Sequence, residues 1–392
     1  MKIFISTGEV SGDLQGSMLV SALRQQAQAQ NIPLQISALG GERMAAAGAQ
    51  MLGNTAAIGS IGILESIPFI IPTWLMQRRA KKHLRGNPPD LLVLIDYMGP
   101  NLSLGAFFRR HLPDIPIVYY IAPQVWVWSP GNQAIEQIVA ITDKMLAIFP
   151  GAAKFFSERG VSVDWVGHPL IDRLQEAPSR DEARDALNLP INKQVVALFP
   201  ASRYQELKYL LPTICEAAQQ LQQQLPELHF VIATSLPDYR EQIESAIQAA
   251  GITATIVNGR SLEVMAAADL AIAKSGTVNL ELALLKIPQV VLFLGNPVTL
   301  WIARNLLKFS IPFMSPVNLV VMREIVPELF QEEATAERIA EESLDFLLNE
   351  SRKQQLSADY DEMRSQLGEH DVCQRAADKI IELALNSETR SQ

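Results

Sequence analysis

The segment DLAIAKSGTVNLELALLKIP, residues 269–288, has the residue types of a phosphate-binding turn. An apolar run ends at three small residues, Ser275, Gly276 and Thr277, and a Leu- and Ala-rich stretch follows, which predicts strand, turn and helix. The first turn of a helix presents unpaired N–H groups and the positive end of the helix dipole, which together attract phosphate. Glu281 lies four residues beyond Thr277 on the same helix face, where its carboxylate could accept hydrogen bonds from a ribose. An ordinary capped helix with a surface glutamate is the alternative, and this segment alone favours it.

A second turn of the same kind lies in LFPASRYQEL, residues 198–207. Ser202 and Arg203 follow a predicted strand, and the forked guanidinium of Arg203 could clamp two phosphate oxygens. Glu206 would support the start of the next helix or orient Arg203. Two such turns in one domain are consistent with a site for a nucleotide diphosphate.

In the first half of the chain, STGEVSGDLQG (6–16) packs Gly8, Ser11, Gly12 and Asp13 into a tight loop after the first predicted strand. The spacing is neither the G-x-G-x-x-G of dinucleotide sites nor the G-x-S-x-G of serine hydrolases, which disfavours both classes. A helix start with small polar residues remains, and it suits a second anionic or hydroxyl-rich ligand.

The stretch LLVLIDYMGPN (91–101) is a nearly continuous apolar strand that ends in Asp96. A carboxylate at the exit of a buried strand tends to have a raised pKa, which makes Asp96 a candidate general base for an attacking hydroxyl. An aspartate that caps the following turn explains the same residue equally well.

Two further stretches carry aromatic or ionisable residues near predicted strand ends. In IAPQVWVWSPG (121–131), Trp126 and Trp128 share one side of an extended chain and could stack on a sugar, although such rings are more often core. VGHPL (166–170) places His168 before a proline close to the expected domain junction. The five histidines show no ligand spacing, so we expect no metal site.

Residues 56–76, AAIGSIGILESIPFIIPTWLM, form the most lipid-like segment. Glu65, Pro68 and Pro72 interrupt it too often for a membrane-spanning helix, and the basic cluster QRRAKKHLRG follows. An apolar wedge beside a basic cluster suits a segment that lies in a membrane surface, whereas a core helix with a solvated end explains the pattern equally well. The residues that we expect to contact the membrane are Ile63, Leu64, Phe69, Trp74, Arg78, Arg79 and Lys82.

These stretches need a scaffold that brings strand ends together, and the alternation of apolar runs with helical patterns predicts one. The runs are KIFIS, LQISALG, LLVLID, IPIVYYIAP, KMLAIF and VDWVG in the first half, then QVVALFP, LHFVIAT, TATIVNG, LAIAK and QVVLFL. Strands separated by helices imply parallel sheets covered on both faces, with ligands at the carboxyl ends of the strands. We therefore predict an α/β protein with two doubly wound, Rossmann-like domains facing a cleft. The expected boundaries are 1–175 and 186–350, with helices at 351–392 that cross back to the first domain.

The composition narrows the class of protein further. The chain has 392 residues, of which 48% are hydrophobic and 19% charged, as in a globular protein. Its net charge of −9 argues against a nucleic-acid partner. Cys215 and Cys373 match no metal or redox spacing and indicate a reducing compartment, and the N-terminus enters a strand without the pattern of a signal peptide.

The combination of these stretches resembles the lipid-A-disaccharide synthase family. GEVSGD, Asp96 with Asn101, PQVWVW, VGHPL, LFPASRYQE and SGTVNLE occur in the family's order, and NLVVMREIVPELFQEE (318–333) resembles its late motif. Seven ordered motifs that cover most of the chain are far more specific than any one of them. The resemblance implies an inverting, metal-independent glycosyltransferase of the GT-B architecture that uses no cofactor.

The family joins UDP-2,3-diacylglucosamine to 2,3-diacylglucosamine 1-phosphate, which gives a β-1,6-linked disaccharide phosphate and UDP. The resemblance implies that Asp96 activates the acceptor's 6-hydroxyl and that Arg203 supports catalysis from the UDP side. It further implies a cytoplasmic protein peripherally associated with the inner membrane, and a homodimer is compatible with it. The implied UDP contacts are Ser202, Arg203, Glu206, Ser275, Gly276, Thr277 and Glu281. The implied acceptor-side residues are Gly8, Ser11, Gly12, Asp13, Asn101, Gln124, Trp126, His168 and Asn318.

The chain departs from the family pattern on the acceptor side. The family usually has D-x-P-D-F-N where this chain reads DYMGPN, which keeps Asp96 and Asn101 but replaces the second acid with Gly99. Gln124 and Ala201 stand where Ser and Gly are common, so the acyl-chain length or the acceptor sugar can differ. The alternatives are another UDP-sugar enzyme of the same fold, either a glycolipid glycosyltransferase or a UDP-sugar epimerase, and a catalytically silent, membrane-associated nucleotide-sugar binder.

Overall fold

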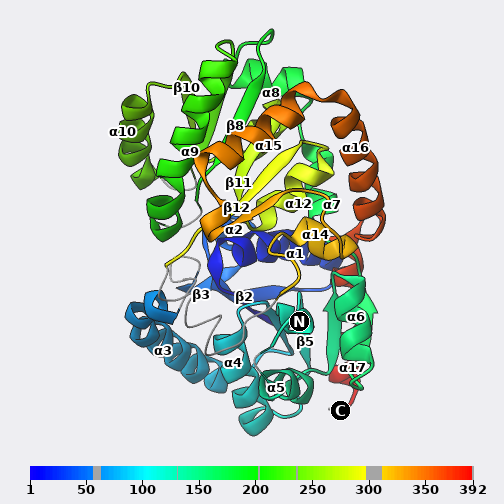
Figure 1. Cartoon of the computed structure of the whole chain (residues 1–392). Helices are drawn as coiled ribbons and strands as arrows, with labels where there is room; N and C mark the ends of the chain where they lie inside the picture. Colours follow the sequence, from blue (N-terminus) through cyan, green and yellow to red (C-terminus); the bar gives the residue numbers. More distant parts are fainter. Residues whose placement is uncertain (56–62, 130, 202–203, 235–236, 297–310, 391–392) are drawn as a thin grey trace. The chain divides into compact units, whose positions relative to one another are not determined.

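The computed structural model describes residues 1–55, 63–129, 131–201, 204–234, 237–296 and 311–390. The chain divides into two compact units, each built on its own sheet (Figure 1). Of the described residues, those within 1–172 and 367–390 form the first unit, and those within 173–296 and 311–366 form the second. The last helix of the chain therefore belongs to the same unit as the first strand.

The described part of the first unit contains a parallel sheet with the strand order β3-β2-β1-β4-β5-β6-β7. Its central strands are apolar, and β4 is buried along its whole length. The strands are β1 (Lys2–Ser6), β2 (Gln35–Gly40), β3 (Gln50–Asn54), β4 (Leu91–Ile95), β5 (Ile117–Tyr120), β6 (Lys144–Ala147) and β7 (Val163–Trp165).

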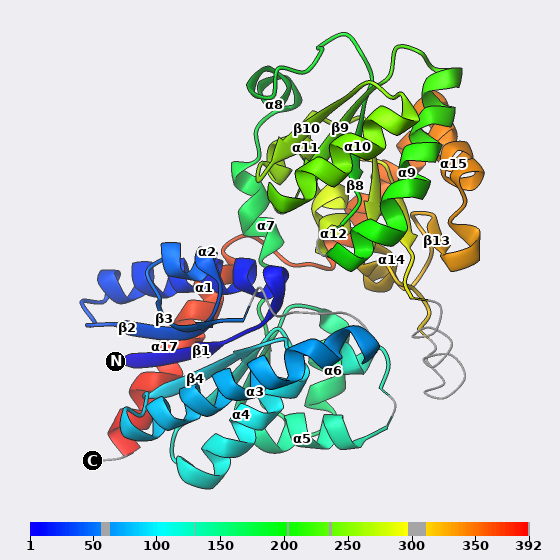
Figure 2. The ribbon, with the colours of Figure 1, turned by 90° about the vertical axis from the view of Figure 1, so that its left-hand side faces the viewer.

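Helices cover both faces of this first sheet, and Figure 2 shows α1 on one side with α3 and α4 on the other. On the first face, α1 and α17 place Leu19 and Ile380 in one core with Ile5 of β1. On the second face, Leu84 of α3 and Phe108 of α4 pack with Phe4. The helices of this unit are α1 (Glu9–Ala29), α2 (Glu42–Ala46), α3 (Ile63–Gly86), α4 (Met98–His111), α5 (Gln133–Ile141), α6 (Pro150–Ser157) and α17 (Val372–Arg390), and α7 (Leu170–Arg173) lies at the boundary.

The second unit repeats the plan with a parallel sheet whose described strands have the order β10-β9-β8-β11-β12-β13. One face of this sheet packs against α8 and α11, which contribute Ala183 and Val264 to the core. The strands are β8 (Val195–Phe199), β9 (His229–Thr234), β10 (Ala254–Asn258), β11 (Leu270–Lys274), β12 (Gln289–Phe293) and β13 (Glu328–Phe330). The helices are α8 (Arg180–Ala186), α9 (Tyr204–Gln224), α10 (Arg240–Ala250), α11 (Ser261–Ala267), α12 (Thr277–Leu284), α14 (Pro316–Val321), α15 (Ala336–Leu348) and α16 (Glu350–Ser365).

The prediction of two doubly wound, parallel α/β domains is confirmed. In a parallel sheet the carboxyl ends of neighbouring strands meet at one edge, and the candidate residues lie at those edges. In the first unit, the turns after β1, β4 and β5 are neighbours because these strands are adjacent. In the second unit, the same holds for the turns after β8 and β11. Among the described residues, none of the helices combines the length and apolar character needed to cross a membrane.

Candidate active site

Asp96 lies directly after β4 and is held there by its backbone. Its N–H donates to the carbonyl of Ile121 at 2.9 Å, and its own carbonyl accepts from Tyr119 Oη at 2.9 Å and Asn101 Nδ2 at 2.7 Å. Asp96 and Tyr97 have φ angles of 43° and 45°, a left-handed conformation that is costly for residues other than glycine. The three hydrogen bonds stabilise that turn, and the carboxylate is left exposed at the edge of the sheet.

The surroundings of Asp96 raise its pKa to about 7. The first cause is desolvation by the protein around the carboxylate, and the second is the negative charge of Glu9 nearby. A backbone hydrogen bond from Tyr97 opposes both. Solvent reaches the side chain as well, so the carboxylate lies at the boundary between protein and water. A carboxylate of this kind titrates closer to neutral pH than an ordinary aspartate and can take up a proton there.

Asn101 is fully buried beneath this turn and joins two strand ends. Its Oδ1 accepts from Ser6 Oγ at 2.7 Å, and its Nδ2 donates to the carbonyls of Ser6, Ile95 and Asp96 at 3.3, 3.0 and 2.7 Å. The amide therefore ties the end of β1 to the end of β4 and fixes the backbone of Asp96.

The loop after β1 is packed closely against the same turn. A Cβ atom at Gly8 would lie 2.5 Å from the Tyr97 ring, and one at Gly12 would lie 2.1 Å from Thr7 Oγ1, so any larger residue would have to displace these side chains. Asp13 is buried and accepts from the backbone N–H groups of Gly41, Arg43 and Met44 at 2.8–3.1 Å.

The loop after β1 therefore takes its shape from the close packing at Gly8 and Gly12 and from the hydrogen bonds of Asp13. Ser11 lies in the first turns of α1 and is half-buried.

The remaining candidates of the first unit differ in accessibility. Gln124 begins a 3₁₀ turn, Gln124–Trp126, and is exposed. Trp126 packs 5.9 Å from the ring of Phe149, and its Nε1 is buried without a hydrogen-bond partner among the described residues. His168 is buried, which lowers its pKa to about 3, and its Nδ1 accepts from the N–H of Leu170 at 3.3 Å. His168 is thus neutral at physiological pH and supports the fold of its segment.

In the second unit, Ser275, Gly276 and Thr277 lie at the start of α12, as the sequence predicted. Ser275 is fixed by two bonds, from its N–H to the carbonyl of Leu292 at 2.8 Å and from its Oγ to the carbonyl of Met314 at 2.7 Å. The N–H of Gly276 donates to Asn279 Oδ1 at 2.7 Å. The other amides of the first turn are those that a helix leaves without an internal partner.

An ion pair joins the two turns of this unit. Lys274, the last residue of β11, reaches Glu206 on α9, with 3.2 Å between Nζ and Oε1. Both side chains are largely buried, so the pair holds the start of α9 beside the start of α12. Ser202 and Arg203, which precede α9, lie outside the described residues.

Glu281 and Asn318 have partners that the sequence did not indicate. Glu281 is buried on α12 and forms an ion pair with Arg173. Asn318 belongs to the second unit, where its Nδ2 donates to Glu328 Oε1 at 2.7 Å and its Oδ1 accepts from the N–H of Ile325 at 2.8 Å. The sequence could not predict the pairing of Arg173 with Glu281, because the two residues are more than a hundred positions apart.

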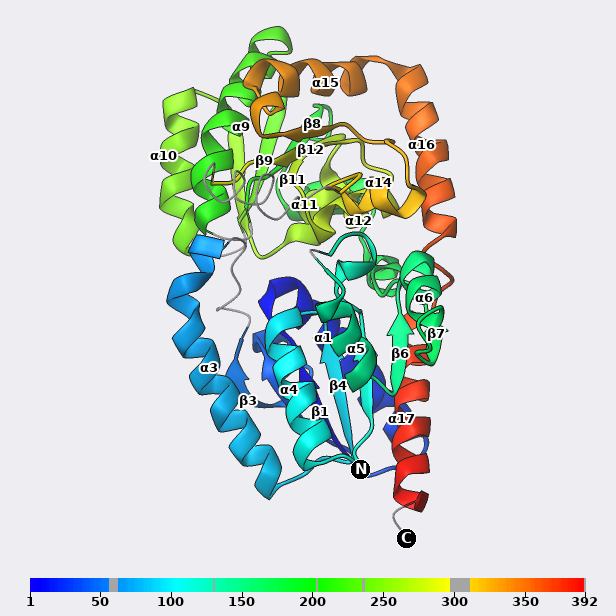
Figure 3. The same cartoon turned by 60° about the horizontal axis from the view of Figure 1, so that its bottom comes forward.

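The basic, lipid-like segment forms α3, which runs beside α4 (Figure 3). Its buried face carries Gln77, Ala80 and Leu84, and its outer face carries apolar residues followed by cations. Phe69 is half-buried, whereas Trp74, Arg78, Arg79 and Lys82 are exposed. The exposed apolar residues Ile70, Ile71 and Leu75 extend this outer face beyond the predicted contacts. The side chains of Ile63 and Leu64 lie outside the described part of the helix.

No group of three or more His, Cys, Asp or Glu side chains that could hold a metal ion occurs among the described residues. Within the first unit, the candidate residues include the Asp96 carboxylate at the strand ends of the sheet. Within the second unit, they include two helix starts joined by the ion pair of Lys274 and Glu206. Such parallel α/β pairs occur in solved structures of nucleotide-sugar enzymes. UDP-GlcNAc 2-epimerase from Neisseria meningitidis is similar, with a TM-score of 0.67 at 12% identity over 98% of this chain and 100% of that one. The epimerase from Methanocaldococcus jannaschii has a TM-score of 0.62 at 16% identity, over 97% of this chain and all of its own.

These likenesses define the fold as the GT-B architecture of two parallel α/β units. Residues 3–382 match the family model described as lipid-A-disaccharide synthetase, and the chain belongs to that family. Relatives named lipid-A-disaccharide synthase include one from Gloeothece citriformis, 56% identical over 97% of this chain and 100% of its own. Another, from Synechocystis sp., is 56% identical over the full length of both chains. One from Geobacter sulfurreducens is 35% identical over 97% of each. The family resemblance found in the sequence is confirmed.

Proposed function

We propose that this chain joins UDP-2,3-diacylglucosamine to 2,3-diacylglucosamine 1-phosphate, giving the β-1,6-linked disaccharide 1-phosphate of lipid A biosynthesis and UDP. The observation that carries the proposal is the 56% identity, over the whole chain, to relatives named for this activity. The similarity to epimerases, at 12–16% identity, concerns the fold alone and does not favour epimerisation.

In the proposed mechanism, Asp96 accepts the proton of the acceptor's 6-hydroxyl as that oxygen attacks the anomeric carbon of the donor. The new carbon–oxygen bond forms while the bond from the anomeric carbon to the β-phosphate oxygen breaks, so the configuration inverts and the electron pair leaves with UDP. Arg203 and the first-turn amides of α12 stabilise the charge that builds on the diphosphate. The exposed Asp96 carboxylate, with its raised pKa and fixed backbone, supports this assignment.

The other candidate residues take supporting roles in the proposal. Ser11, Gln124 and Trp126 contact the acceptor, while Asn101 and Asp13 shape the turns around it. On the donor side, Thr277 and its helix start bind the diphosphate, and Ser202 assists them. Gly8, Gly12, His168, Ser275, Gly276, Asn318 and the Glu206–Lys274 pair hold the backbone in place.

Incubating the purified chain with both acylated sugars tests the proposed reaction directly. UDP release should accompany a product with the mass of the tetraacyl disaccharide phosphate, and EDTA should leave the rate unchanged. Conversion of the UDP-sugar without an acceptor would indicate an epimerase instead. Binding of UDP without turnover would indicate a silent binder, and loss of activity in EDTA with recovery in manganese would refute the metal-independent mechanism.

We expect Glu281→Gln to weaken UDP binding by about 10-fold, because a neutral amide accepts a ribose hydroxyl less strongly than a carboxylate does. The substitution keeps the shape of the side chain while it also removes the charge that pairs with Arg173. Calorimetric titration with UDP gives the dissociation constant. Glu263→Gln is a matched control, since Glu263 pairs with Arg260 at 3.1 Å elsewhere in the same unit. Equal affinities in the two variants would rule out the ribose role.

The proposal also places the chain at the cytoplasmic face of the inner membrane, with the outer face of α3 against the lipid. Ile71 is 68% and Leu75 41% exposed on the same helix as the exposed cations Arg78, Arg79 and Lys82. Each cation near an anionic surface contributes about 1 kcal/mol, and the apolar side chains add to this by leaving water.

We therefore expect the double variant Ile71→Ser/Leu75→Ser to lose at least about 10-fold in binding to vesicles that contain anionic lipid. Co-sedimentation with the vesicles measures the partition, and raised salt should weaken what remains. Ile191→Ser removes an apolar residue of the other unit that is 58% exposed, between the values for Ile71 and Leu75, and should change nothing. If both variants bind vesicles as well as the unaltered chain does, the membrane contact lies elsewhere.

A further inference from the structure

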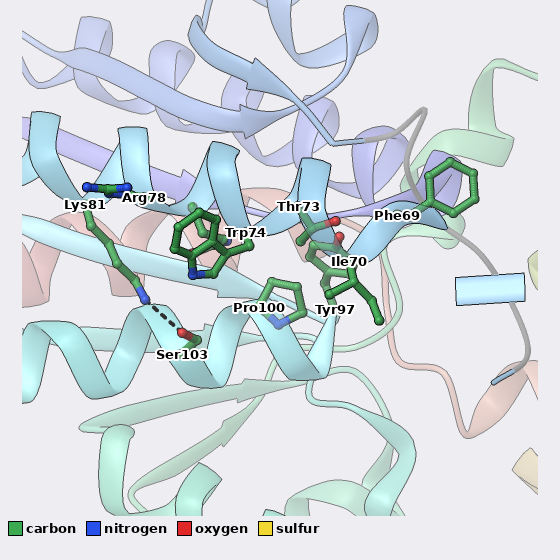
Figure 4. A pocket seen from close by; sticks show the side chains of 10 residues that line it. Phe69, Ile70, Thr73, Trp74, Arg78, Lys81, Tyr97, Pro100 and Ser103 are labelled. Carbon is green, nitrogen blue, oxygen red and sulfur yellow. Dashed lines mark hydrogen bonds between the residues drawn. The ribbon is translucent and has the colours of Figure 1, made fainter. Parts of the chain in front are cut away.

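A pocket of about 560 Å³ opens between α3 and α4 in the first unit. Its volume falls within the range of about 300–1,000 Å³ that is typical of small-molecule sites. Figure 4 shows side chains from both helices turned toward this space. The pocket is lined by Phe69, Ile70, Thr73, Trp74, Gln77, Arg78, Lys81, Tyr97, Pro100 and Ser103.

The α3–α4 pocket has an apolar part and a cationic part. Phe69, Ile70 and Trp74 provide hydrocarbon and aromatic surface toward the start of α3, and Arg78 and Lys81 follow one to two turns later. None of the ten lining residues carries a carboxylate. This combination suits a ligand that has a hydrocarbon chain joined to an anionic group.

The two cations have no anionic partner within the described structure. Arg78 lies 5.5 Å from the centre of the Trp74 ring, and Lys81 donates to Ser103 Oγ at 2.7 Å. Neither forms an ion pair with a described residue. Burial lowers the pKa of Lys81, because its ammonium has lost part of its water without gaining a counter-charge. An anion in the pocket would supply that counter-charge.

Gln77 is the residue that narrows the ligand class. It is 6% exposed, and neither its Oε1 nor its Nε2 has a hydrogen-bond partner among the described residues. Buried polar groups are nearly always hydrogen-bonded in native proteins, so an amide with both ends unsatisfied requires an explanation. A ligand amide offers one carbonyl for Nε2 and one N–H for Oε1, which satisfies both ends at once. An ester offers an acceptor but no donor.

We propose that the α3–α4 pocket binds an N-acylated amino-sugar phosphate, with the acyl chain on the apolar wall, the acyl amide on Gln77 and the phosphate on Arg78 and Lys81. This inference rests on the proposed function, since the acceptor of that reaction has this chemistry. Tyr97, which lines the pocket, directly follows Asp96, so the sugar ring lies between the pocket and the catalytic carboxylate. A glycerophospholipid shares the acyl chain and the phosphate, but its acyl linkage is an ester and has no N–H to donate to Gln77 Oε1.

The first test compares acceptor kinetics in Lys81→Ala and in Lys379→Ala. Lys379 is an exposed lysine on α17 of the same unit and does not line the pocket. Lys81→Ala should raise KM for the phosphorylated acceptor about 10-fold or more, while kcat and KM for the UDP-sugar change less than about twofold. With an acceptor that lacks the 1-phosphate, the two variants should have the same KM. An equal loss for both acceptors would refute the phosphate contact.

The second test concerns the amide. Gln77→Leu should raise KM about 10-fold for the N-acyl acceptor and clearly less for an analogue with an ester at that position, because the ester makes only the bond to Nε2. Circular dichroism at the assay temperature establishes that this variant is folded. If the ester analogue and the N-acyl acceptor respond alike, Gln77 does not contact the acyl amide.

Two further outcomes separate this proposal from the proposed function. If no transfer occurs, calorimetry with N-acylglucosamine 1-phosphate still shows whether the α3–α4 pocket binds this ligand. An affinity that is unchanged in Lys81→Ala would refute the pocket proposal. If transfer occurs and Lys81→Ala and Gln77→Leu leave every KM unchanged, the function stands and the pocket proposal fails. Competition by phosphatidylglycerol that depends on both Lys81 and Gln77 would identify a membrane phospholipid as the occupant instead.

Discussion

Replacing Asp96 with asparagine should lower kcat by about 10²–10⁴-fold and leave UDP affinity unchanged. The range is that for loss of a positioned general base. Asparagine has nearly the same shape, and the hydrogen bonds that hold the turn are made by the backbone of Asp96, so the turn should keep its conformation. Quenched-flow measurement of UDP release gives the rate, and calorimetry gives the UDP affinity. A kcat within about threefold of the unaltered enzyme would assign the base to another residue.

The pH dependence of the unaltered enzyme gives an independent check on the same residue. Only the ionised carboxylate can accept the proton, so kcat should fall as the pH decreases through the raised pKa of about 7. The residual activity of Asp96→Asn should lack that acidic limb. Asp90→Asn serves as the control, because Asp90 precedes the same strand at its opposite end and accepts from the N–H of Lys2 at 2.6 Å. That variant should keep both the rate and the pH profile.

Most of the scaffold could be predicted because long apolar runs bounded by turn residues are a strong signal. The strands that were missed are those in which this signal is weak. β3, with the sequence QMLGN, contains Gly53 and Asn54, and its pairing with β2 is irregular at Ala38 and Leu39. β13 has only three residues, and its position at the edge of the second sheet comes from pairing with β12. Tertiary contacts, rather than local patterns, determine both strands.

The sequence predicted the types of the candidate residues and their positions along the chain, but it did not predict the side chains with which they form hydrogen bonds and ion pairs. A strand followed by Asp96 indicates a carboxylate at the edge of the sheet, yet the left-handed backbone there depends on Tyr119 and Asn101. Likewise, the ion pairs of Lys274 with Glu206 and of Arg173 with Glu281 join segments that are far apart in sequence. Spacing within one stretch carries no information about such contacts.

This distinction changes the interpretation of several small and polar residues. The resemblance implied that Asp13 and Asn101 lie on the acceptor side, and either could have been taken for a direct contact. In the structure both side chains are buried and bind the backbone of neighbouring turns. Residues of this kind position the catalytic group without touching the substrate, and their effect on catalysis should be indirect.

Asn101→Ala tests such an indirect role and should have the second-largest effect on activity. Truncation leaves Ser6 Oγ and the carbonyl of Ile95 without a buried partner, which should lower the free energy of unfolding by about 2–4 kcal/mol. The carbonyl of Asp96 also loses a donor, so the carboxylate should move. A displacement of about 1 Å at a reacting group can lower kcat by about 10²-fold. Urea unfolding and steady-state rates measure the two effects separately.

A loss of stability alone would not prove that Asn101 positions the base, so the decisive readout is the pH profile. If Asp96 moves toward solvent, its carboxylate is less desolvated, and the midpoint of the acidic limb should shift to lower pH. Asp269→Asn is the matched control. Asp269 lies just before β11 and pairs with the fully buried Arg184, with 2.7 Å between Oδ2 and Nη2, and the substitution weakens this ion pair. That change should destabilise the second unit strongly but leave the pH midpoint in place. A midpoint that stays fixed in Asn101→Ala as well would mean that this residue supports the fold and not the catalytic carboxylate.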